Sequence, residues 1–224
     1  MTTRLVRQGA WELIAEHIKE LIFTGQLRPD DRVPQEEIAA RLGVSRIPVR
    51  EALISLQHDG WVKNIPHRGS FVQGFDEEAI EDLHEAIGLV YGLVARRAAL
   101  RATDDDIASL TAAQSGLRTA DSAADVLTAN NRFLKELHRV GGSQRITSML
   151  RTVSVIVPGN FFEVVPEAAL IQRRGTASMV KAIKARDGDL AAAAILTMTR
   201  HQGAAVLELL KQRNIVSRGT AVVG

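Results

Sequence analysis

Hydrophobic residues recur at helical spacing in two short segments near the start of the chain. The first covers residues 11–22, and Gly25 follows it as a residue that commonly stops a helix. The second begins at a proline and two acidic residues within 34–37 and ends at Gly43. We expect Leu42 to lie on the buried face of this second helix.

A third helix is predicted directly after this glycine, with Ser45 as its N-cap. Val49, Leu53 and Leu56 give it an apolar stripe, and it ends by Gly60. Two short helices joined by a turn that contains glycine are typical of a helix-turn-helix.

Apolar and polar residues then alternate on either side of a turn at residues 66–69, which contains Pro and Gly. The alternation in residues 61–65 and 70–73 predicts a β-hairpin. A helix-turn-helix followed directly by a hairpin is a winged helix.

The pattern beyond residue 75 predicts a mainly α fold, an antiparallel all-α bundle, because short connections join long helices. We expect six helices here. They cover residues 79–101, a segment after an N-cap at Thr103, residues from Asp121 or Ser122 to 141–142, from about 143 to 158–160, about 166–186 and about 189–214. Residues 152–165 allow either a broken helix, which we favour, or a hairpin. The simplest division of the chain is into two domains. Residues 1–75 form a winged helix-turn-helix domain, a type that binds DNA, and residues 76–224 form a helical domain, with a hinge at 73–76.

Composition excludes several classes of protein. Hydrophobic residues make up 46% of the 224 residues and charged residues 24%, which is typical of a globular chain. The absence of cysteine excludes disulfide scaffolds and thiolate sites, and no apolar stretch is long enough to span a membrane. We expect a cytoplasmic protein without membrane association.

Overall charge does not locate a functional surface. The net charge is +2, and the first 75 residues hold 10 basic and 9 acidic side chains. A nucleic-acid partner therefore has to be recognised by individual arginines. Arg46 and Arg50 lie four residues apart on the third helix, away from its apolar stripe, where they can enter a major groove.

Several segments in order resemble the DNA-binding domain of GntR-family transcription regulators. They are LGVSRIPVREAL at residues 42–53, IFTGQLRP at 22–29, DGWV at 59–62 and RGSFV at 68–72. The helical remainder resembles the FCD effector-binding domain of the family's FadR branch, on helix count and residues such as Phe133. The resemblance implies DNA contacts by these residues: Ser45, Arg46, Ile47, Pro48 and Arg50, with Arg68 and Gly69 at the wing tip in the minor groove.

One residue departs from the family pattern at the start of the second helix. Glu36 stands where some members place a basic DNA contact. We expect it to face the N-terminus of its own helix instead, because a helix N-terminus favours negative charge.

The family's metal site is expected to be absent. The resemblance implies one Asp and three His ligands, and the matching positions hold Asn130, Leu134, Thr176 and His201. Because an amide is a poor ligand for a transition metal and leucine is none, we predict no metal and no other cofactor.

An effector pocket in the bundle should therefore be more apolar than a pocket that holds small carboxylic acids through a metal. Ile87 also replaces an arginine that often pairs with an effector carboxylate in the family. Polar candidates for this pocket are His84, Tyr91, Asn130, His138, Arg151 and His201.

These patterns together predict a homodimeric transcription regulator, most often a repressor in this family, that binds double-stranded palindromic operator DNA and a small-molecule effector. Two recognition helices related by two-fold symmetry read a palindrome. The alternative is a regulator without effector whose helical domain only dimerises. We expect no enzyme, because no nucleophile triad, phosphate-binding glycine loop or zinc-protease motif is found.

Overall fold

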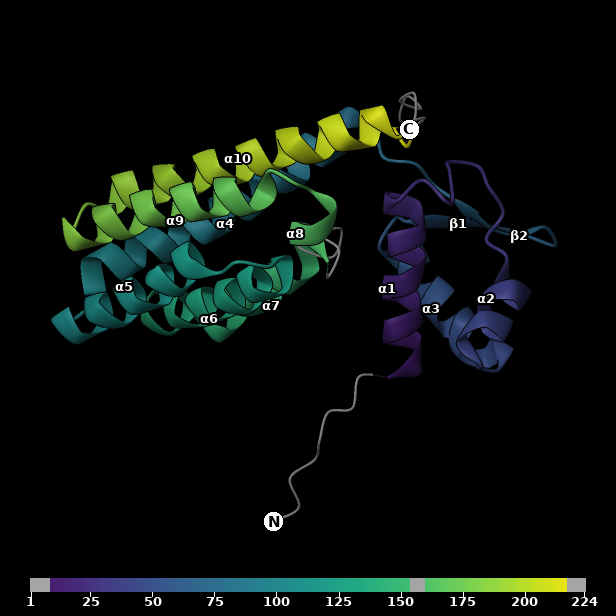
Figure 1. The fold of residues 1–224 in the computed structure, drawn as a ribbon, viewed down its shortest axis with the longest axis horizontal. Helices are drawn as coiled ribbons and strands as arrows, with labels where there is room; N and C mark the ends of the chain where they lie inside the picture. The colour runs from purple at the N-terminus through teal and green to yellow at the C-terminus, as the bar shows by residue number, and fades with distance from the viewer. Residues whose placement is uncertain (1–8, 154–159, 217–224) are drawn as a thin grey trace, which may run out of the picture. The chain divides into compact units, whose positions relative to one another are not determined.

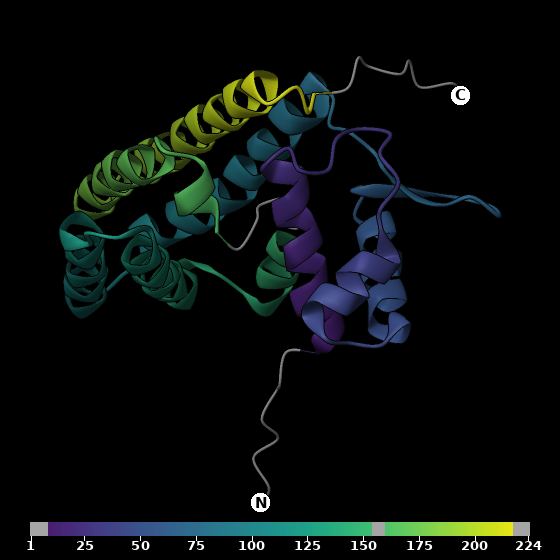
Figure 2. The ribbon, with the colours of Figure 1, turned by 45° about the vertical axis from the view of Figure 1, so that its right-hand side comes forward.

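The computed structural model describes residues 9–153 and 160–216, with the backbone alone for residues 151–153. Figure 1 draws its helices and strands, and Figure 2 shows them from a second direction. The chain divides into two compact units, residues 1–76 with 210–224, and residues 77–209. Each helix in the described part of the chain is too short or too polar to span a lipid bilayer.

The first unit contains the three predicted helices. They are α1 (Ala10–Phe23), α2 (Gln35–Leu42) and α3 (Arg46–His58), and α1 packs against α3. Gly43 has a φ of 65°, the left-handed conformation that ends α2 without a steric penalty. Leu42 is 38% exposed, so its expected burial was wrong. It is the last residue of α2, where the chain already turns away from the core.

The predicted hairpin is confirmed as β1 (Val62–Ile65) and β2 (Gly69–Val72), which pair antiparallel with Val62 opposite Val72. A segment at residues 30–33 runs along the other edge of β2. There, the backbone N–H of Val33 donates to the Ser70 carbonyl oxygen at 2.9 Å. This pairing covers an edge that a two-stranded hairpin would leave open.

The core of the first unit includes three aromatic rings. Phe23 and Phe75 lie with their ring centroids 5.6 Å and 4.9 Å from that of Trp61. The end of the chain's last helix and the residues after it belong to the same unit. There the Arg213 guanidinium donates to the Phe23 carbonyl oxygen, and Ile215 is fully buried. The sequence did not indicate this contribution from residues after 209.

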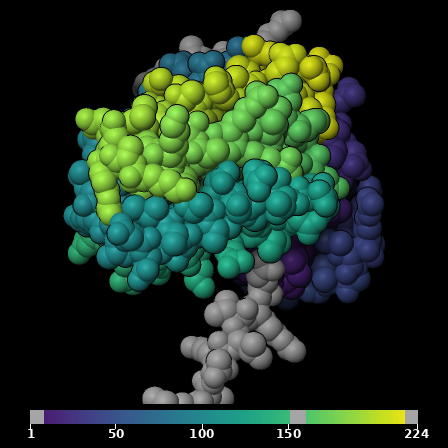
Figure 3. Space-filling model, turned by 60° about the vertical axis from the view of Figure 1, so that its left-hand side comes forward, coloured from purple at the N-terminus to yellow at the C-terminus, as the bar shows by residue number. Residues whose placement is uncertain are grey.

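The second unit is the predicted bundle of helices. Its elements are α4 (Glu77–Arg101), α5 (Asp104–Thr119), α6 (Ala123–Gly141), α7 (Gln144–Val153), α8 (Phe161–Val164), α9 (Ala168–Lys184) and α10 (Gly188–Gln212), whose last residues lie in the first unit. Figure 3 shows α9, in green, against the blue-green layer that contains α5. Arg173 on α9 donates to the carbonyl oxygens of Leu117 and Ala120, at the end of α5.

Residues 154–159 lie outside the described range, so the choice between a broken helix and a hairpin at 152–165 falls partly on undescribed residues. The helix α7 ends at Val153, directly before this gap, and α8 begins at Phe161, after its N-cap Asn160.

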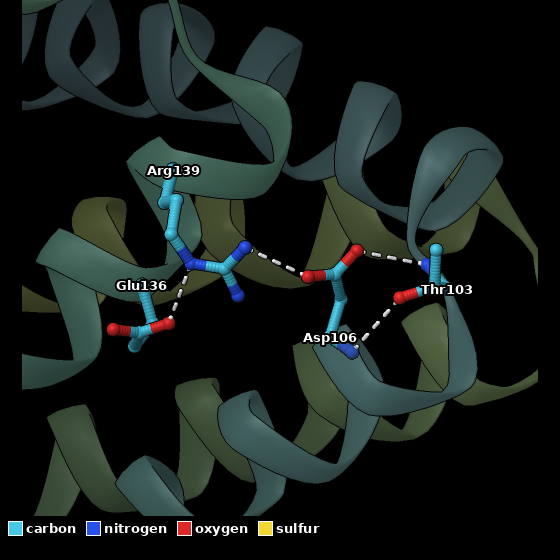
Figure 4. A network of polar contacts seen from close by, with 4 residues as sticks. All are labelled: Thr103, Asp106, Glu136 and Arg139. Carbon is cyan, nitrogen blue, oxygen red and sulfur yellow. Dashed lines mark hydrogen bonds and ion pairs between the residues drawn. The ribbon is translucent and has the colours of Figure 1, made fainter.

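Side chains at the helix starts fix where α5 and α6 begin. Thr103 and Ser122 are the N-caps, and each forms a capping box with the aspartate three residues later, Asp106 and Asp125. Figure 4 shows that Asp106 also binds Arg139 of α6, with 2.8 Å between Oδ1 and Nη1. The Thr103 backbone N–H and then the Arg139 guanidinium lower the pKa of Asp106 to about 2.

Candidate nucleic-acid interface and ligand cavity

A concave surface of about 790 Å³ lies between the start of α2, the exposed face of α3 and the hairpin. We call this surface the α3 groove. Its lining residues are Arg32, Val33, Pro34, Gln35, Glu36, Glu37, Arg46, Arg50, Leu53, Ile54, Asn64, Gly69 and Ser70. The helix α3 and the segment at residues 30–33 thus place three arginines around this groove.

The two arginines of α3 differ in their partners. Arg46 pairs with Glu36, with 2.8 Å between Nη2 and Oε1, and both side chains are exposed. Glu36 lies in the first turn of α2, at the expected N-terminal end of that helix, and its carboxylate also reaches Arg46 of α3. Arg50 is exposed and forms no ion pair within the described residues. Its guanidinium can therefore donate to a guanine edge or a phosphate.

Two large apolar side chains share this face of α3. Ile47 is 69% exposed and Ile54 is 64% exposed. Residues 47, 50 and 54 follow one another at helical spacing, so Arg50 lies between the two isoleucines. An exposed apolar side chain beside an arginine is suited to contact the methyl group of thymine.

The hairpin turn carries a further arginine, Arg68. Arg68 lies with its guanidinium carbon 5.7 Å from the centre of the Phe71 ring. Gly69 has a φ of 103°, and a Cβ atom there would lie 3.2 Å from Arg32 Nε, so a side chain would crowd Arg32. Sequence reasoning missed Arg32, because its place beside the turn depends on the pairing of residues 30–33 with β2.

All seven residues expected to contact DNA lie in the described part of the first unit. Ser45, Arg46, Ile47, Arg50 and Arg68 are exposed, and Pro48 and Gly69 are partly buried. Ser45 occupies the N-cap position of α3, but its side chain forms no capping hydrogen bond. Its hydroxyl can therefore donate to a phosphate.

The second unit contains a half-open cavity of about 280 Å³ lined by α4, α6, α8, α9 and α10, which we call the bundle cavity. Its lining residues are His84, Ile87, Tyr91, Leu127, Asn130, Asn131, Leu134, Phe161, Phe162, Gln172, Ile195, Met198, Thr199 and Gln202. Three of the six predicted polar candidates, His84, Tyr91 and Asn130, lie together there.

A chain of amide side chains crosses one side of the bundle cavity. Gln202 Nε2 donates to Gln172 Oε1 at 2.7 Å, and Gln172 Nε2 donates to Asn130 Oδ1 at 2.7 Å. The chain joins α10, α9 and α6. Sequence reasoning missed both glutamines, because their contact links helices thirty residues apart along the chain.

His84 is 4% exposed and lies where α4 and α10 approach closely, since a Cβ at Gly203 would be 2.9 Å from the Cβ of His84. Burial lowers the pKa of His84, although its hydrogen bond to the Ile80 backbone opposes this shift. Burial also raises the pKa of Tyr91 to about 12. Both side chains are therefore neutral at pH 7.

Two of the other three candidates, His138 and His201, are described and do not line the cavity. Tyr91 lines the cavity, and the His138 ring packs against the Tyr91 ring with 5.5 Å between the two centroids. Burial lowers the pKa of His138. The Arg151 side chain lies outside the described residues.

His201 is exposed, so its expected place in the pocket was wrong. The cavity face of α10 carries residues 195, 198, 199 and 202, at helical spacing, and position 201 lies off this stripe. Thr176, at another expected ligand position, is buried, and its hydroxyl donates to the Gln172 carbonyl oxygen. Within the described residues, no three His, Cys, Asp or Glu side chains are grouped so that they could hold a metal ion.

Comparison with known families matches both parts of the chain. Residues 11–72 match the model of bacterial regulatory proteins of the gntR family, and residues 82–202 match the FCD domain. An HTH-type transcriptional regulator of Mycobacterium tuberculosis is 34% identical over 149 residues. That alignment covers 66% of this chain and 61% of the relative. The Nta operon transcriptional regulator of Aminobacter aminovorans is 32% identical over 131 residues, which cover 58% of this chain and 61% of the relative.

Solved structures share the fold. The E. coli protein McbR/YncC aligns with a TM-score of 0.60 and 17% identity, over 90% of this chain and 99% of that one. A GntR family member from Pseudomonas syringae aligns with a TM-score of 0.53 and 19% identity, over 92% of this chain and 87% of that one. At these identities the likeness concerns the fold alone.

Proposed function

Because the chain belongs to the GntR family of bacterial regulatory proteins and carries an FCD domain, we propose that it is a repressor whose operator binding is controlled by a small molecule. The chain is a DNA-binding transcription regulator of this family. In our proposal residues 1–75 bind DNA, and residues 76–224 dimerise and bind the effector. We assign it no catalytic activity.

The observation that supports the DNA-binding role most strongly is the composition of the exposed face of α3. Arg50, without an ion-pair partner in the described residues, stands between two exposed isoleucines, Ile47 and Ile54. A guanidinium that binds guanine O6 and N7, flanked by apolar groups that contact thymine methyls, reads sequence in a major groove. Arg68 and Gly69 at the hairpin turn would follow the backbone into the adjacent minor groove.

The exposed face of α4 supports dimerisation through the helical unit. Leu89, Leu93 and Leu100 are 57%, 41% and 66% exposed and lie along this one helix. A row of exposed leucines is covered when two copies pair. A symmetric dimer would present two α3 helices to the two halves of a palindrome.

The bundle cavity supports an effector over the alternative in which the helical unit only dimerises. A purely structural bundle would gain packing energy by filling a space of about 280 Å³. The side chains of the bundle instead leave this space unfilled. Polar groups of His84 and of the amide chain are among those that line it.

Selection of bound duplexes from a random pool, with the full chain, tests the DNA-binding role. We expect the recovered sites to share a palindrome, two chains to bind each duplex in sedimentation, and transcription from a promoter bearing the site to fall. Recovery of unrelated sequences would contradict specific binding, and one chain per duplex would contradict the dimer. A rise in transcription would make the protein an activator. Failure of every member of a metabolite library to alter operator affinity would favour the effector-free alternative.

A further inference from the structure

Backbone pairing fixes Arg32 at the edge of the hairpin. On one side of it, the Val33 N–H donates to the Ser70 carbonyl oxygen at 2.9 Å. On the other side, the Val72 N–H donates to the Asp31 carbonyl oxygen, also at 2.9 Å. Arg32 itself forms an antiparallel bridge with β2. The backbone of Arg32 is therefore held to the hairpin like that of a third strand.

The side chain of Arg32 reaches the hairpin turn. A Cβ atom at Gly69 would lie 3.2 Å from Arg32 Nε and 3.5 Å from its Nη2, so the guanidinium lies directly beside the turn. The side chain is exposed, and it lines the α3 groove together with Arg50. Over the residues that the structure describes, Arg32 forms no ion pair. Its guanidinium can therefore donate to a bound anion.

The charged groups of the α3 groove are distributed unevenly among its walls. Its two carboxylates, Glu36 and Glu37, both belong to α2, and Glu36 is paired with Arg46. Two cations of the lining have no ion-pair partner in the described residues. They are Arg32 at the hairpin edge and Arg50 on α3. A phosphate in the groove is therefore attracted to the hairpin and α3 and repelled by α2.

Side-chain hydrogen bonds fix the hairpin relative to α3. Ser70 Oγ donates to Asn64 Oδ1, and Asn64 Nδ2 donates to Gln57 Oε1, each at 2.6 Å. These bonds join β2 and β1 to α3, which carries Gln57. The spacing between α3 and the hairpin, and with it the place of Arg32, is therefore set by the protein itself.

DNA that receives both α3 and the turn has to lay one of its strands across the α3 groove. In our proposed function α3 enters a major groove, and the turn with Arg68 and Gly69 enters the adjacent minor groove. On a duplex, a single sugar-phosphate backbone separates a major groove from the minor groove beside it. This backbone therefore passes between α3 and the turn, where Arg32 lies.

We propose that Arg32 binds a phosphate of this backbone and is an eighth DNA contact, beside the seven that the family resemblance implies. The proposal rests on the proposed placement of α3 and the turn in adjacent grooves. A phosphate contact carries no sequence information, so Arg32 contributes affinity for any duplex. Arg50, in contrast, distinguishes between bases.

The salt dependence of binding tests this contact. Arg32→Gln removes the charge but keeps a polar side chain. We expect it to weaken binding of the full chain to a random duplex and to the selected operator by the same factor, and to reduce the slope of log K against log salt by about 0.9 per bound chain. Arg32→Lys keeps the charge and should retain the slope. Fluorescence anisotropy at several salt concentrations measures both quantities.

Arg28→Gln is the matched control. Arg28 is exposed and lies four residues before Arg32, but it does not line the α3 groove. Its substitution changes the net charge by the same amount, so the affinity for both duplexes should stay within about twofold and the slope should be unchanged. An equal loss in Arg28→Gln and Arg32→Gln would show that net charge is responsible, and would overturn the proposal.

Ethylation of single phosphates in the selected operator locates the contact on the unsubstituted protein. In each half-site, ethylation should weaken binding at a phosphate between the base pair whose identity Arg50 reads and the minor groove that Arg68 enters. With Arg32→Gln, ethylation of that phosphate should no longer weaken binding. The mapping on the unsubstituted protein stands even if Arg32→Gln fails to fold.

An unchanged salt slope in folded Arg32→Gln, or no effect of ethylation between the two grooves, would overturn the proposal. A loss of operator affinity with unchanged affinity for random DNA would also overturn it, because Arg32 would then read a base. Failure of the proposed function gives a different result. If no palindrome is recovered but Arg32→Gln still reduces the slope on random DNA, the phosphate contact holds and specific regulation fails. If an operator is recovered and the slope is unchanged, regulation holds and the contact is wrong.

Discussion

Glu36 on α2 holds Arg46, the first residue of α3, in an ion pair with 2.8 Å between Oε1 and Nη2. Both side chains are exposed, so the pair contributes little to folding stability. The ion pair is important because it occupies the Arg46 guanidinium, which has to leave the Glu36 carboxylate before it can bind a phosphate. The carboxylate also places negative charge in the α3 groove.

Removing this carboxylate should strengthen binding to DNA of any sequence. With Glu36→Gln, Arg46 is free to bind a phosphate, and the slope of log K against log salt should steepen by about 0.9, the value for one more neutralised phosphate. Fluorescence anisotropy with a random duplex at several salt concentrations measures both effects. Glu37→Gln is the control, since Glu37 also lines the groove but forms no ion pair within the described residues. An equal gain in that variant would show that net charge alone is responsible.

Arg50→Ala should weaken binding to the selected operator by about 1–3 kcal/mol and relax the preference at one position in each half-site. The reason is that the exposed Arg50 guanidinium lies in the α3 groove without an ion-pair partner in the described residues. Anisotropy with the operator and its single-base variants measures the change. Arg101→Ala is the control, because Arg101 lies in the helical unit. It should leave the affinities for the operator and for random DNA unchanged. If Arg50→Ala weakens random DNA as much as the operator, Arg50 contacts phosphate rather than a base.

Filling the bundle cavity should separate ligand binding from DNA binding. Asn130→Phe puts a ring into the space and removes the acceptor of Gln172. A small molecule that weakens operator binding by the unsubstituted protein should therefore lose this effect, while operator affinity without it stays within about twofold. Anisotropy with the operator, with and without the molecule, measures both. Lys135→Phe introduces the same residue at an exposed position of the same helix. This control variant should respond to the small molecule as the unsubstituted protein does. An unchanged response to the molecule in Asn130→Phe would place its binding site elsewhere.

Purified protein should hold no stoichiometric transition metal. Asn130 and Leu134 line the cavity where the family resemblance implies Asp and His ligands, and neither replaces them. Elemental analysis of protein purified without chelator measures the metal content. One tightly held metal per chain would contradict this prediction and direct attention to His138, which packs on Tyr91 beside the cavity.

Acid should destabilise the helical unit as pH falls from about 4 to about 2. The pKa of Asp106 is about 2 in the folded chain, below its ordinary value of 3.8, so the folded state binds fewer protons in this interval. The stabilisation is therefore complete above the ordinary pKa and is lost as pH falls through the folded value. Asp106→Asn should lower Tm at pH 7, and its difference from the unsubstituted protein should shrink toward pH 2.

Circular dichroism at a series of pH values measures this difference in Tm. Asp105→Asn is the control, because Asp105 lies in the same first turn of α5 without the contacts to Thr103 and Arg139. If the Asp106→Asn difference stayed constant down to pH 2, the carboxylate would not be the titrating group.

The features that sequence predicted are those that neighbouring residues determine. Ser122 with Asp125 specifies a helix start, and Gly43 specifies a helix end, because the bonds and the backbone conformation involve residues close in sequence. The apolar stripe of α3 is likewise confirmed, with Val49, Leu53 and Leu56 buried.

The features that sequence missed depend on the phase of a helix or on partners distant in the chain. His201 and Gln202 are neighbours, yet a rotation of about 100° between them exposes one and places the other in the cavity. Arg32 reaches the hairpin turn through strand pairing across nearly forty residues. The residues near Gln202 and Arg32 in the sequence therefore do not indicate where either side chain lies.

The last turn of α10 and the residues after it belong to the first unit, where Ile215 is buried and Val216 pairs with Phe75. The unit that carries α3 is therefore assembled from two separate stretches of the gene. A chimeric regulator made by joining a foreign DNA-binding module at residue 76 would keep a C-terminal segment shaped for the module it lost. Transplanting operator specificity between such proteins then requires two junctions, one near residue 76 and a second near residue 210.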